Sequence, residues 1–249
     1  MNKKINKMKT IWVSATAAMA LTITLTNVSP VFADTLNKVP GGNGFVKLVT
    51  FNKYIINEGN ITADIKIPKV EGLENKNLED NLNKEFMTQG KELYDNLIKE
   101  LPGIKDGHKY VGTDFSVKTD TDKILSIETS KEEIQASSYV TKKHYTINKS
   151  KQIILTLPSL FKDDKYIDII SNNIKEQMRA QMKSDENKIY FLDQKDMPQM
   201  DFDKIDKNQD FYLNDKGELV ICFNEYEVAP GYMGAVEFTI PTDVVDFIK

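Results

Sequence analysis

Hydrophobic residues alternate with polar ones in two neighbouring runs between residues 45 and 67. The second run places Ile61, Ala63, Ile65 and Ile67 at every other position. A period of two is typical of strands that bury one face. The polar segment 57–60 separates the runs and contains a glycine, which favours a turn. We therefore predict a β-hairpin over residues 45–67.

A period of three to four residues follows and predicts a long amphipathic helix. Its apolar stripe consists of Leu78, Leu82, Phe86, Leu93 and Leu97. Asn77, with Asp80 three residues later, is the N-cap that this pattern favours. Pro102 and Gly103 end the helix, because proline cannot continue a helix and glycine tolerates its exit.

Residues 109–157 return to alternation, with turn signals at 120–122 and 148–151. This pattern predicts a meander of antiparallel strands. After Pro158, a second helix is expected, capped by Asp163 or Asp164. Its buried face is formed by Tyr166, Ile170, Ile174 and Met178.

The last fifty residues predict further strands. The continuous apolar run 219–223 indicates a buried strand, and the alternation in 236–240 indicates a strand with one solvent-exposed face. Thr242 is expected to cap a short closing helix. The whole pattern predicts an α+β fold with antiparallel sheet or sheets, two main helices and a short C-terminal helix.

The N-terminus resembles a secretory signal peptide. Four lysines precede an uncharged apolar stretch, and Val31-Phe32-Ala33 places small-enough side chains at the positions that signal peptidase reads, just before Asp34. We expect residues 1–33 to be removed by cleavage at Ala33-Asp34, and residues 34–44 to form a flexible leader. The protein would then be secreted or associated with the cell wall, and would contact the membrane only if the signal segment stays uncleaved.

Charge narrows the range of partners. The formal net charge of −4 becomes −8 without residues 1–33, because that segment carries four lysines and no acid. An acidic protein is unsuited to the phosphates of nucleic acid, so we expect no nucleic-acid partner. The same charge permits a cationic protein partner, although it serves solubility equally well.

Few residues could hold a metal. The chain has two histidines, His108 and His144, and one cysteine, whereas catalytic zinc needs about three protein ligands. Asp206, Asn208 and Asp210 share the spacing of an EF-hand, but the positions that need glycine and glutamate hold Phe211 and Gly217. We predict no metal and no cofactor. A solvated loop is favoured for residues 201–210, and weak calcium binding there stays open.

Catalytic motifs are also missing from the sequence. There is no GxSxG nucleophile motif, and Cys222 lies inside the apolar run, where it is expected to be buried and unreactive. With 37 acidic residues, a carboxylate pair could arise by chance, so a hydrolase stays open as the weakest alternative. We predict a non-enzyme without catalytic residues.

Aromatic residues in the last loop are the best candidates for recognition. Tyr226, Pro230 and Tyr232 follow the buried strand, in a loop with Gly231. Loop aromatics serve recognition or pack the loop onto its sheet, and both interpretations stay open with packing slightly favoured. We add Tyr139 and His144, from the meander, as further candidate contacts.

The C-terminal third carries a family resemblance. The run 211–234 (FYLNDKGELVICFNEYEVAPGYMG), followed by Val236-Glu237-Phe238-Thr239-Ile240-Pro241, resembles the extracellular domain of RsiV-type anti-sigma factors. The same domain accompanies the peptidoglycan deacetylase PdaC. The resemblance is looser upstream, where it includes Leu160-Phe161-Lys162-Asp163. It suggests a PdaC-like part over residues 45–157 and an RsiV-like part over residues 158–249, packed as one unit.

The resemblance implies a compact α+β domain that binds rather than reacts. In the RsiV type this domain captures lysozyme and so triggers proteolytic release of a sigma factor. This chain lacks the Gly-Gly-Ala-His turn of many relatives and has Ser137-Ser138-Tyr139-Val140 in its place. Only about ten residues precede the apolar stretch, and no deacetylase domain follows, so we expect the domain to stand alone.

These observations lead to one expected function and two alternatives. We expect an exported binding domain whose partner is lysozyme or another cationic protein of the cell wall. A module that binds peptidoglycan or another glycan is the alternative from a second class, and the hydrolase is the third.

Overall fold

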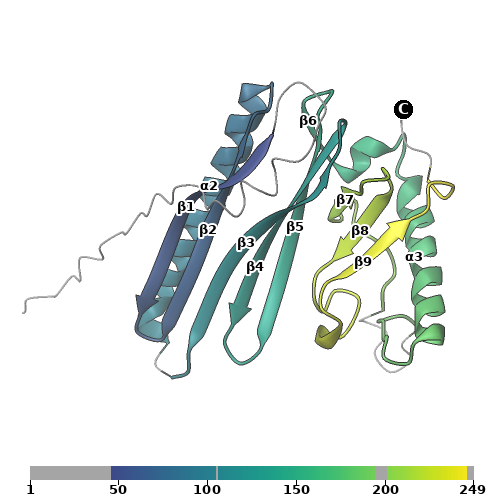
Figure 1. The fold of residues 1–249 in the computed structure, drawn as a ribbon. Coiled ribbons are helices and arrows are strands. Elements are labelled where there is room, and N and C mark those ends of the chain that lie inside the picture. The colour runs from purple at the N-terminus through teal and green to yellow at the C-terminus, as the bar shows by residue number, and fades with distance from the viewer. Residues whose placement is uncertain (1–45, 105, 194–200, 246–249) are drawn as a thin grey trace, which may run out of the picture.

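The computed structural model describes residues 46–104, 106–193 and 201–245 (Figure 1). Strands and helices alternate irregularly along the chain, which confirms the predicted α+β class. The first part contains β1 (Lys47–Glu58), β2 (Ile61–Glu71), α2 (Lys76–Glu100), η1 (Leu101–Gly103), β3 (Lys109–Asp120), β4 (Ile124–Ile134), β5 (Ser138–Asn148) and β6 (Ile153–Leu155). The second contains η2 (Leu157–Leu160), α3 (Lys165–Ser184), β7 (Phe211–Leu213), β8 (Leu219–Phe223), η4 (Gly231–Met233) and β9 (Val236–Ile240).

The first six strands form one sheet in chain order. The predicted hairpin is present as β1 and β2, and the predicted meander as the antiparallel series β3 to β6. One pairing was not predicted: β2 and β3 run parallel over residues 61–65 and 109–113. A parallel pair needs a long crossover, and α2 provides it.

Helix α2 lies along one face of this sheet (Figure 1) and buries Leu82, Phe86 and Leu97 against it. Gly90 allows close approach, since a Cβ at this position would lie 2.6 Å from Cγ1 of Ile67. The predicted cap Asn77 was wrong. The helix begins two residues earlier, with Asn75 as the N-cap, because it is the Asn75 side chain that accepts from the free N–H of Leu78.

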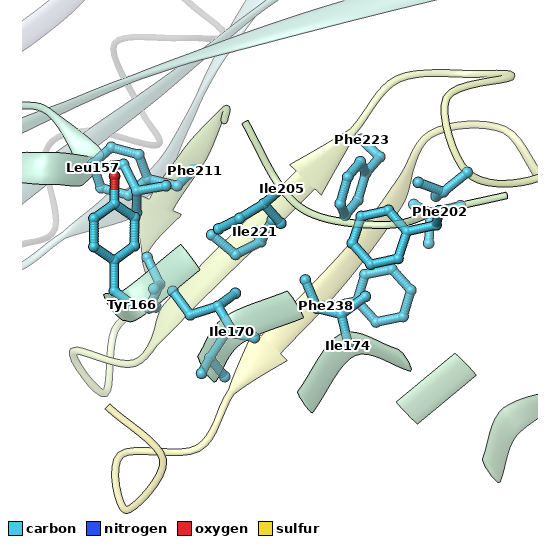
Figure 2. Close-up of a cluster of buried hydrophobic side chains, with 14 of the residues drawn as sticks. Leu157, Tyr166, Ile170, Ile174, Phe202, Ile205, Phe211, Ile221, Phe223 and Phe238 are labelled. Carbon is cyan, nitrogen blue, oxygen red and sulfur yellow. The ribbon is translucent and has the colours of Figure 1, made fainter. Parts of the chain in front are cut away.

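The remaining three strands form a second sheet in the order β7-β8-β9, and α3 packs on one side of it. Asp164 is the N-cap residue of α3, although its side chain makes no capping bond. The core between the helix and this sheet is rich in aromatic rings and isoleucines (Figure 2). Its labelled members are Leu157, Tyr166, Ile170, Ile174, Phe202, Ile205, Phe211, Ile221, Phe223 and Phe238.

The other side of the second sheet faces β4 and β5 of the first sheet, away from α2 (Figure 1). Tyr212, Val220 and Cys222 form a small buried cluster there. Because both sides of β8 are covered, all five of its residues are buried, which confirms the prediction from its continuous apolar run. Strand β9 keeps the predicted alternation of buried and exposed residues.

Some predictions fall at or beyond the limits of the described residues. The signal segment 1–33 and the leader 34–44 lie outside them. Residues 242–244 form a turn, so the predicted closing helix is not seen up to Val245, and 246–249 lie outside the described range. Within the described ranges, no helix is both long and apolar enough to cross a bilayer.

Candidate binding surface

The loop after β8 exposes the side chain of Tyr226 to solvent. Val228 and Ala229 are buried and anchor the loop, whereas Tyr226 is 56% exposed. The backbone of Tyr226 has a φ of 66°, a conformation uncommon for residues other than glycine. Backbone strain of this kind persists only where surrounding contacts impose it, and it is enriched at functional sites.

The short helix η4 presents a second tyrosine. Pro230 precedes it and accepts a hydrogen bond from the N–H of Met233 at 2.9 Å. Tyr232 is 66% exposed, and its hydroxyl donates to the carbonyl oxygen of Asn187 at 3.0 Å. This bond restricts the ring, so a large apolar surface is held in one orientation at the surface.

Gly231 brings the two tyrosines into one surface. A Cβ at Gly231 would lie 2.3 Å from Cζ and from the hydroxyl oxygen of Tyr226, so the Tyr226 ring rests directly on this glycine. A glycine is therefore required if the ring is to keep this position.

Tyr139 joins the surface from the other sheet. Its ring lies 6.1 Å from that of Tyr226, at 34° to it, within the range of favourable aromatic pairs. The exposed Ile134 pairs with Ser138, next to Tyr139, in the β4–β5 ladder. Clustered exposed apolar groups are a feature of interaction sites. We name the set Tyr139, Tyr226, Pro230 and Tyr232 the tyrosine surface.

An acidic recess of about 390 Å³ adjoins Tyr226. Three carboxylates and one ammonium group line it, so its charge is net negative. Its lining residues are Phe191, Asp201, Phe202, Asp203, Lys204, Tyr226 and Glu227. This arrangement complements a basic side chain on a partner.

A second hollow, of about 480 Å³, lies between α2 and the neighbouring face of strands β2 to β5. Phe86 and Leu93 supply apolar walls, and Thr113, Thr129 and Thr141 line the sheet side. The hydroxyls of Thr113 and Thr129 donate to the backbone carbonyl oxygens of Lys66 and Lys143. Its lysines are paired with acids: Lys66 with Asp114, Lys131 with Glu133, Lys142 with Glu128 and Lys143 with Glu85. The hollow is therefore close to neutral.

His144 does not belong to the tyrosine surface. It lies on β5, next to Tyr145, whose ring packs on Phe86 of α2, so His144 points to the opposite side of the sheet. Its side chain is 0% exposed, because the second sheet covers it and Tyr212 stacks on its ring at 5.0 Å. A partner at the surface cannot touch it, which corrects its assignment as a candidate contact.

His144 instead links the two sheets. Its backbone N–H donates to Oδ1 of Asp210 at 2.9 Å, and its Nδ1 contacts Oδ2 of the same carboxylate at 2.7 Å. Its Nε2 lies 3.2 Å from Oε2 of Glu128, on β4. A ring with a carboxylate at each nitrogen can satisfy both only as an imidazolium. We call His144, Asp210 and Glu128 the inter-sheet clamp.

The electrostatics agree with a charged His144. Burial alone lowers the pKa of His144, but hydrogen bonds to Asp210, Cys222 and Glu128 outweigh burial and raise the pKa to about 11. The hydrogen bond from His144, with help from Lys142, lowers the pKa of Glu128 to about 2. A carboxyl group with so low a pKa has no proton to give at neutral pH, so Glu128 is unsuited to general acid catalysis.

Cys222 behaves as the sequence predicted. It is buried beside the clamp, and burial raises the pKa of its thiol to about 11. At neutral pH such a group is a thiol rather than a nucleophilic thiolate.

A metal would fit this cluster poorly. The side-chain donors of His144, Asp210 and Cys222 lie within 4.8 Å of one another, as metal ligands would. However, both nitrogens of His144 are already engaged with carboxylates, and metal binding would require a neutral ring and a thiolate. The donor chemistry therefore favours a hydrogen-bonded clamp.

Two residues of the inter-sheet contact were missed by sequence reasoning. Asp210 was assigned to a solvated loop, and Asn224 was not considered, although its Oδ1 accepts from the N–H of Lys142 at 2.6 Å. The nearby residues Phe202 and Ile205 are buried, so the segment 201–210 is packed onto the core rather than solvated throughout. The EF-hand-like spacing of Asp206, Asn208 and Asp210 left calcium binding open for this segment. In the structure, the side chain of Asp210 instead contacts His144.

Comparisons with known proteins agree with this architecture. The family described as "Protein of unknown function (DUF3298)" matches residues 158–243. Anti-sigma-V factor RsiV of Bacillus subtilis (strain 168) is 44% identical over 232 residues, which cover 93% of this chain and 81% of that protein.

Two crystal structures of DUF3298-family proteins share the fold. The protein from Bacteroides fragilis NCTC 9343 has a TM-score of 0.57 at 17% identity, over 82% of this chain and 93% of that one. The protein from Pseudomonas aeruginosa PAO1 has a TM-score of 0.57 at 12% identity, over 80% of this chain and 91% of that one. At such low identity these structures support the fold alone.

Proposed function

Because this chain belongs to the RsiV family, we propose that its folded part is a non-catalytic domain that captures lysozyme or another cationic protein of the cell envelope. The observation that carries the proposal is the tyrosine surface beside the acidic recess. Exposed tyrosines held in fixed positions are typical anchors of protein interfaces. The carboxylates next to them favour a partner with basic side chains, and opposite charge speeds encounter.

The surface spans both sheets. Tyr139 comes from the first sheet, whereas Tyr226, Pro230 and Tyr232 come from the loop between β8 and β9 of the second. A partner that engages them all therefore needs the two sheets in their observed arrangement. Such a surface recognises the shape of a folded protein rather than a short linear peptide.

Binding to lysozyme tests the proposal directly. The chain from Asp34 onward, which keeps every described residue, is titrated with hen lysozyme at moderate salt by calorimetry. Cytochrome c serves as a cationic control that distinguishes specific recognition from charge attraction alone. We expect micromolar or tighter binding to lysozyme and at least a tenfold loss in Tyr226→Ala and Tyr232→Ala. Absence of binding at micromolar protein, or equal binding to both proteins, removes the lysozyme proposal.

Export is part of the same proposal. Residues 1–33 have the composition of a signal peptide, and cleavage before Asp34 would place the domain outside the membrane. N-terminal sequencing of the protein from the culture supernatant and from washed cell walls tests both cleavage and location. A protein that keeps Met1 and is found only in the cytosol contradicts the proposed export.

A glycan ligand is the second candidate, and the hollow beside α2 favours it. Threonines from three strands and apolar side chains of α2 line this nearly neutral groove, as suits a sugar chain. Sedimentation with purified peptidoglycan tests this alternative. Binding that is lost in Thr141→Glu and retained in Tyr232→Ala would assign the glycan to the groove rather than to the tyrosine surface.

A further inference from the structure

The outer edge of β5 is completed by side chains instead of by a strand. Strand β6 pairs with β5 only at residues 146–148. Before residue 146, the edge N–H groups of Lys142 and His144 donate at 2.6 and 2.9 Å to the side chains of Asn224 and Asp210. These two residues directly flank strands β8 and β7 of the second sheet. Open edge groups are usually covered in native proteins. Here the covering residues also join the two sheets.

The two acceptors lie at different places. Asp210 holds both the backbone and the ring of His144 at the buried clamp. Asn224 lies at the loop end of β8, two positions before Tyr226, and its partner Lys142 is three positions after Tyr139. The bond between Asn224 and Lys142 is therefore the cross-sheet hydrogen bond nearest in sequence to the contact between these tyrosines.

Asn224 also shapes the loop that carries Tyr226. Its carbonyl oxygen accepts from the N–H of Glu227 at 3.2 Å and closes the turn around Tyr226. One residue thus uses its backbone to form the turn and its side chain to attach the turn to β5. The strained backbone of Tyr226 needs such support.

We infer that Asn224 is a positioning residue of the tyrosine surface: its side chain holds the Tyr226 loop against β5 so that Tyr226 and Tyr139 face a partner together. This inference rests on the proposed function. Without the bond, the loop would have to be ordered during binding, and affinity would fall by the cost of that ordering. Tyr226 would remain present but would no longer be held beside Tyr139.

Three variants separate positioning from general stability. Asn224→Ala removes the acceptor, and Asn224→Asp keeps an oxygen at the same position. Asn214→Ala is the matched control, because the side chain of Asn214 stabilises the turn between β7 and β8 through hydrogen bonds to Lys216 and Glu218. We expect about a 5- to 30-fold loss of lysozyme affinity in Asn224→Ala. Asn224→Asp should stay within about threefold of the native protein, and Asn214→Ala should lower thermal stability without weakening binding.

A double-mutant cycle with Tyr226→Ala provides the decisive readout. If Asn224 acts through Tyr226, Asn224→Ala should lower lysozyme affinity by less than about twofold in a protein that already carries Tyr226→Ala. Additive losses overturn the inference and leave the proposed function standing. An unchanged lysozyme affinity in the single variant Asn224→Ala also overturns the inference and leaves the proposed function standing.

A second measurement needs no ligand. Hydrogen exchange of the Lys142 amide and the nuclear Overhauser contact between the Tyr139 and Tyr226 rings are followed in the native protein and in Asn224→Ala. Faster exchange and loss of the ring contact support positioning even if lysozyme fails to bind. Persistence of the ring contact in Asn224→Ala contradicts it.

Discussion

Nδ1 of His144 lies 2.7 Å from Oδ2 of Asp210, and this contact crosses from the first sheet to the second. Glu128 approaches the other ring nitrogen at 3.2 Å, so the fully buried imidazolium lies between two carboxylates that stay partly exposed. Removal of one member of a buried charge cluster leaves the others uncompensated, which costs more than the net contribution of the cluster. Loss of one member of the clamp should therefore weaken the attachment of the two sheets, even where the intact clamp contributes little net stability.

The first prediction concerns the stability of the clamp. His144→Gln removes the charge between Asp210 and Glu128, and we expect the free energy of unfolding to fall by about 3 kcal/mol. Urea denaturation followed by circular dichroism measures the change. His108→Gln is the control, since His108 lies in a loop with Nε2 2.9 Å from Oγ1 of Thr62, and it should change stability by less than about 0.5 kcal/mol. Equal effects of the two substitutions would show that the clamp is unimportant.

The second prediction concerns alkaline pH. The pKa of His144 is raised from its ordinary value of 6.5 to about 11 in the folded protein. A raised pKa means that folding favours the proton, so the stabilisation is complete below pH 6.5 and is lost as pH rises through the folded pKa. Stability should therefore decline between pH 6.5 and 9.5 in the native protein and decline less in His144→Gln. Denaturant midpoints at several pH values measure this, and parallel curves for the two proteins would contradict it.

Acid should weaken the clamp through Glu128, which is the third prediction. The pKa of Glu128 is lowered from 4.5 to about 2, so its stabilisation is present above pH 4.5 and is lost as pH falls through the folded pKa. Glu128→Gln should be less stable than the native protein at pH 5 and should lose less stability on further acidification. If its acid denaturation curve keeps the native slope between pH 4.5 and 2, the assignment of Glu128 is wrong.

The fourth prediction concerns the thiol. Cys222 is buried, and the pKa of its thiol is raised to about 11, so the native protein should resist a thiol reagent such as 5,5′-dithiobis(2-nitrobenzoate) at pH 8. The same protein in concentrated urea should react fully within minutes, which provides the positive control. Rapid reaction of the folded protein would mean that the interface between the sheets opens readily.

The fifth prediction concerns Gly231 beneath Tyr226. A Cβ here would lie 2.3 Å from the Tyr226 ring, and the exposed ring can swing away. Gly231→Ala should therefore change stability by less than about 1 kcal/mol but weaken lysozyme binding about as much as Tyr226→Ala. Calorimetry and thermal denaturation measure the two effects.

Gly217→Ala is the matched control for that substitution. Gly217 has a φ of 77° in the β7–β8 turn, away from the tyrosine surface, so alanine there should lower stability and leave binding unchanged. If Gly231→Ala binds as tightly as the native protein, the position of the Tyr226 ring is unimportant for recognition.

Some features could be predicted from local patterns because they depend on which face of an element is buried. Alternation identified the hairpin of β1 and β2 and the meander of β3 to β6. The continuous apolar run of β8 required cover on both sides, and it has that cover. Aromatic residues next to Pro230 and Gly231 indicated an exposed or packed loop, and the structure exposes Tyr226 and Tyr232.

Other features depend on contacts between distant parts of the chain. Local patterns do not show what covers a strand, so the sequence offered His144 as a candidate contact although the second sheet buries it. The parallel pairing of β2 with β3 likewise follows from the path of α2 across the sheet. Asp210 and Asn224 carry no local signal, because their hydrogen-bond partners are backbone groups of a strand far away in the sequence.

The sequence by itself determined the α+β class, the order of most elements and the buried state of Cys222. Those properties follow from side-chain chemistry at a regular spacing, which neighbouring residues supply. Only the tertiary structure decided that His144 is a charged link between sheets, and that Tyr139 meets Tyr226. The reason is physical: the pKa of a buried group and the contact between two rings depend on which distant parts of the chain pack beside them.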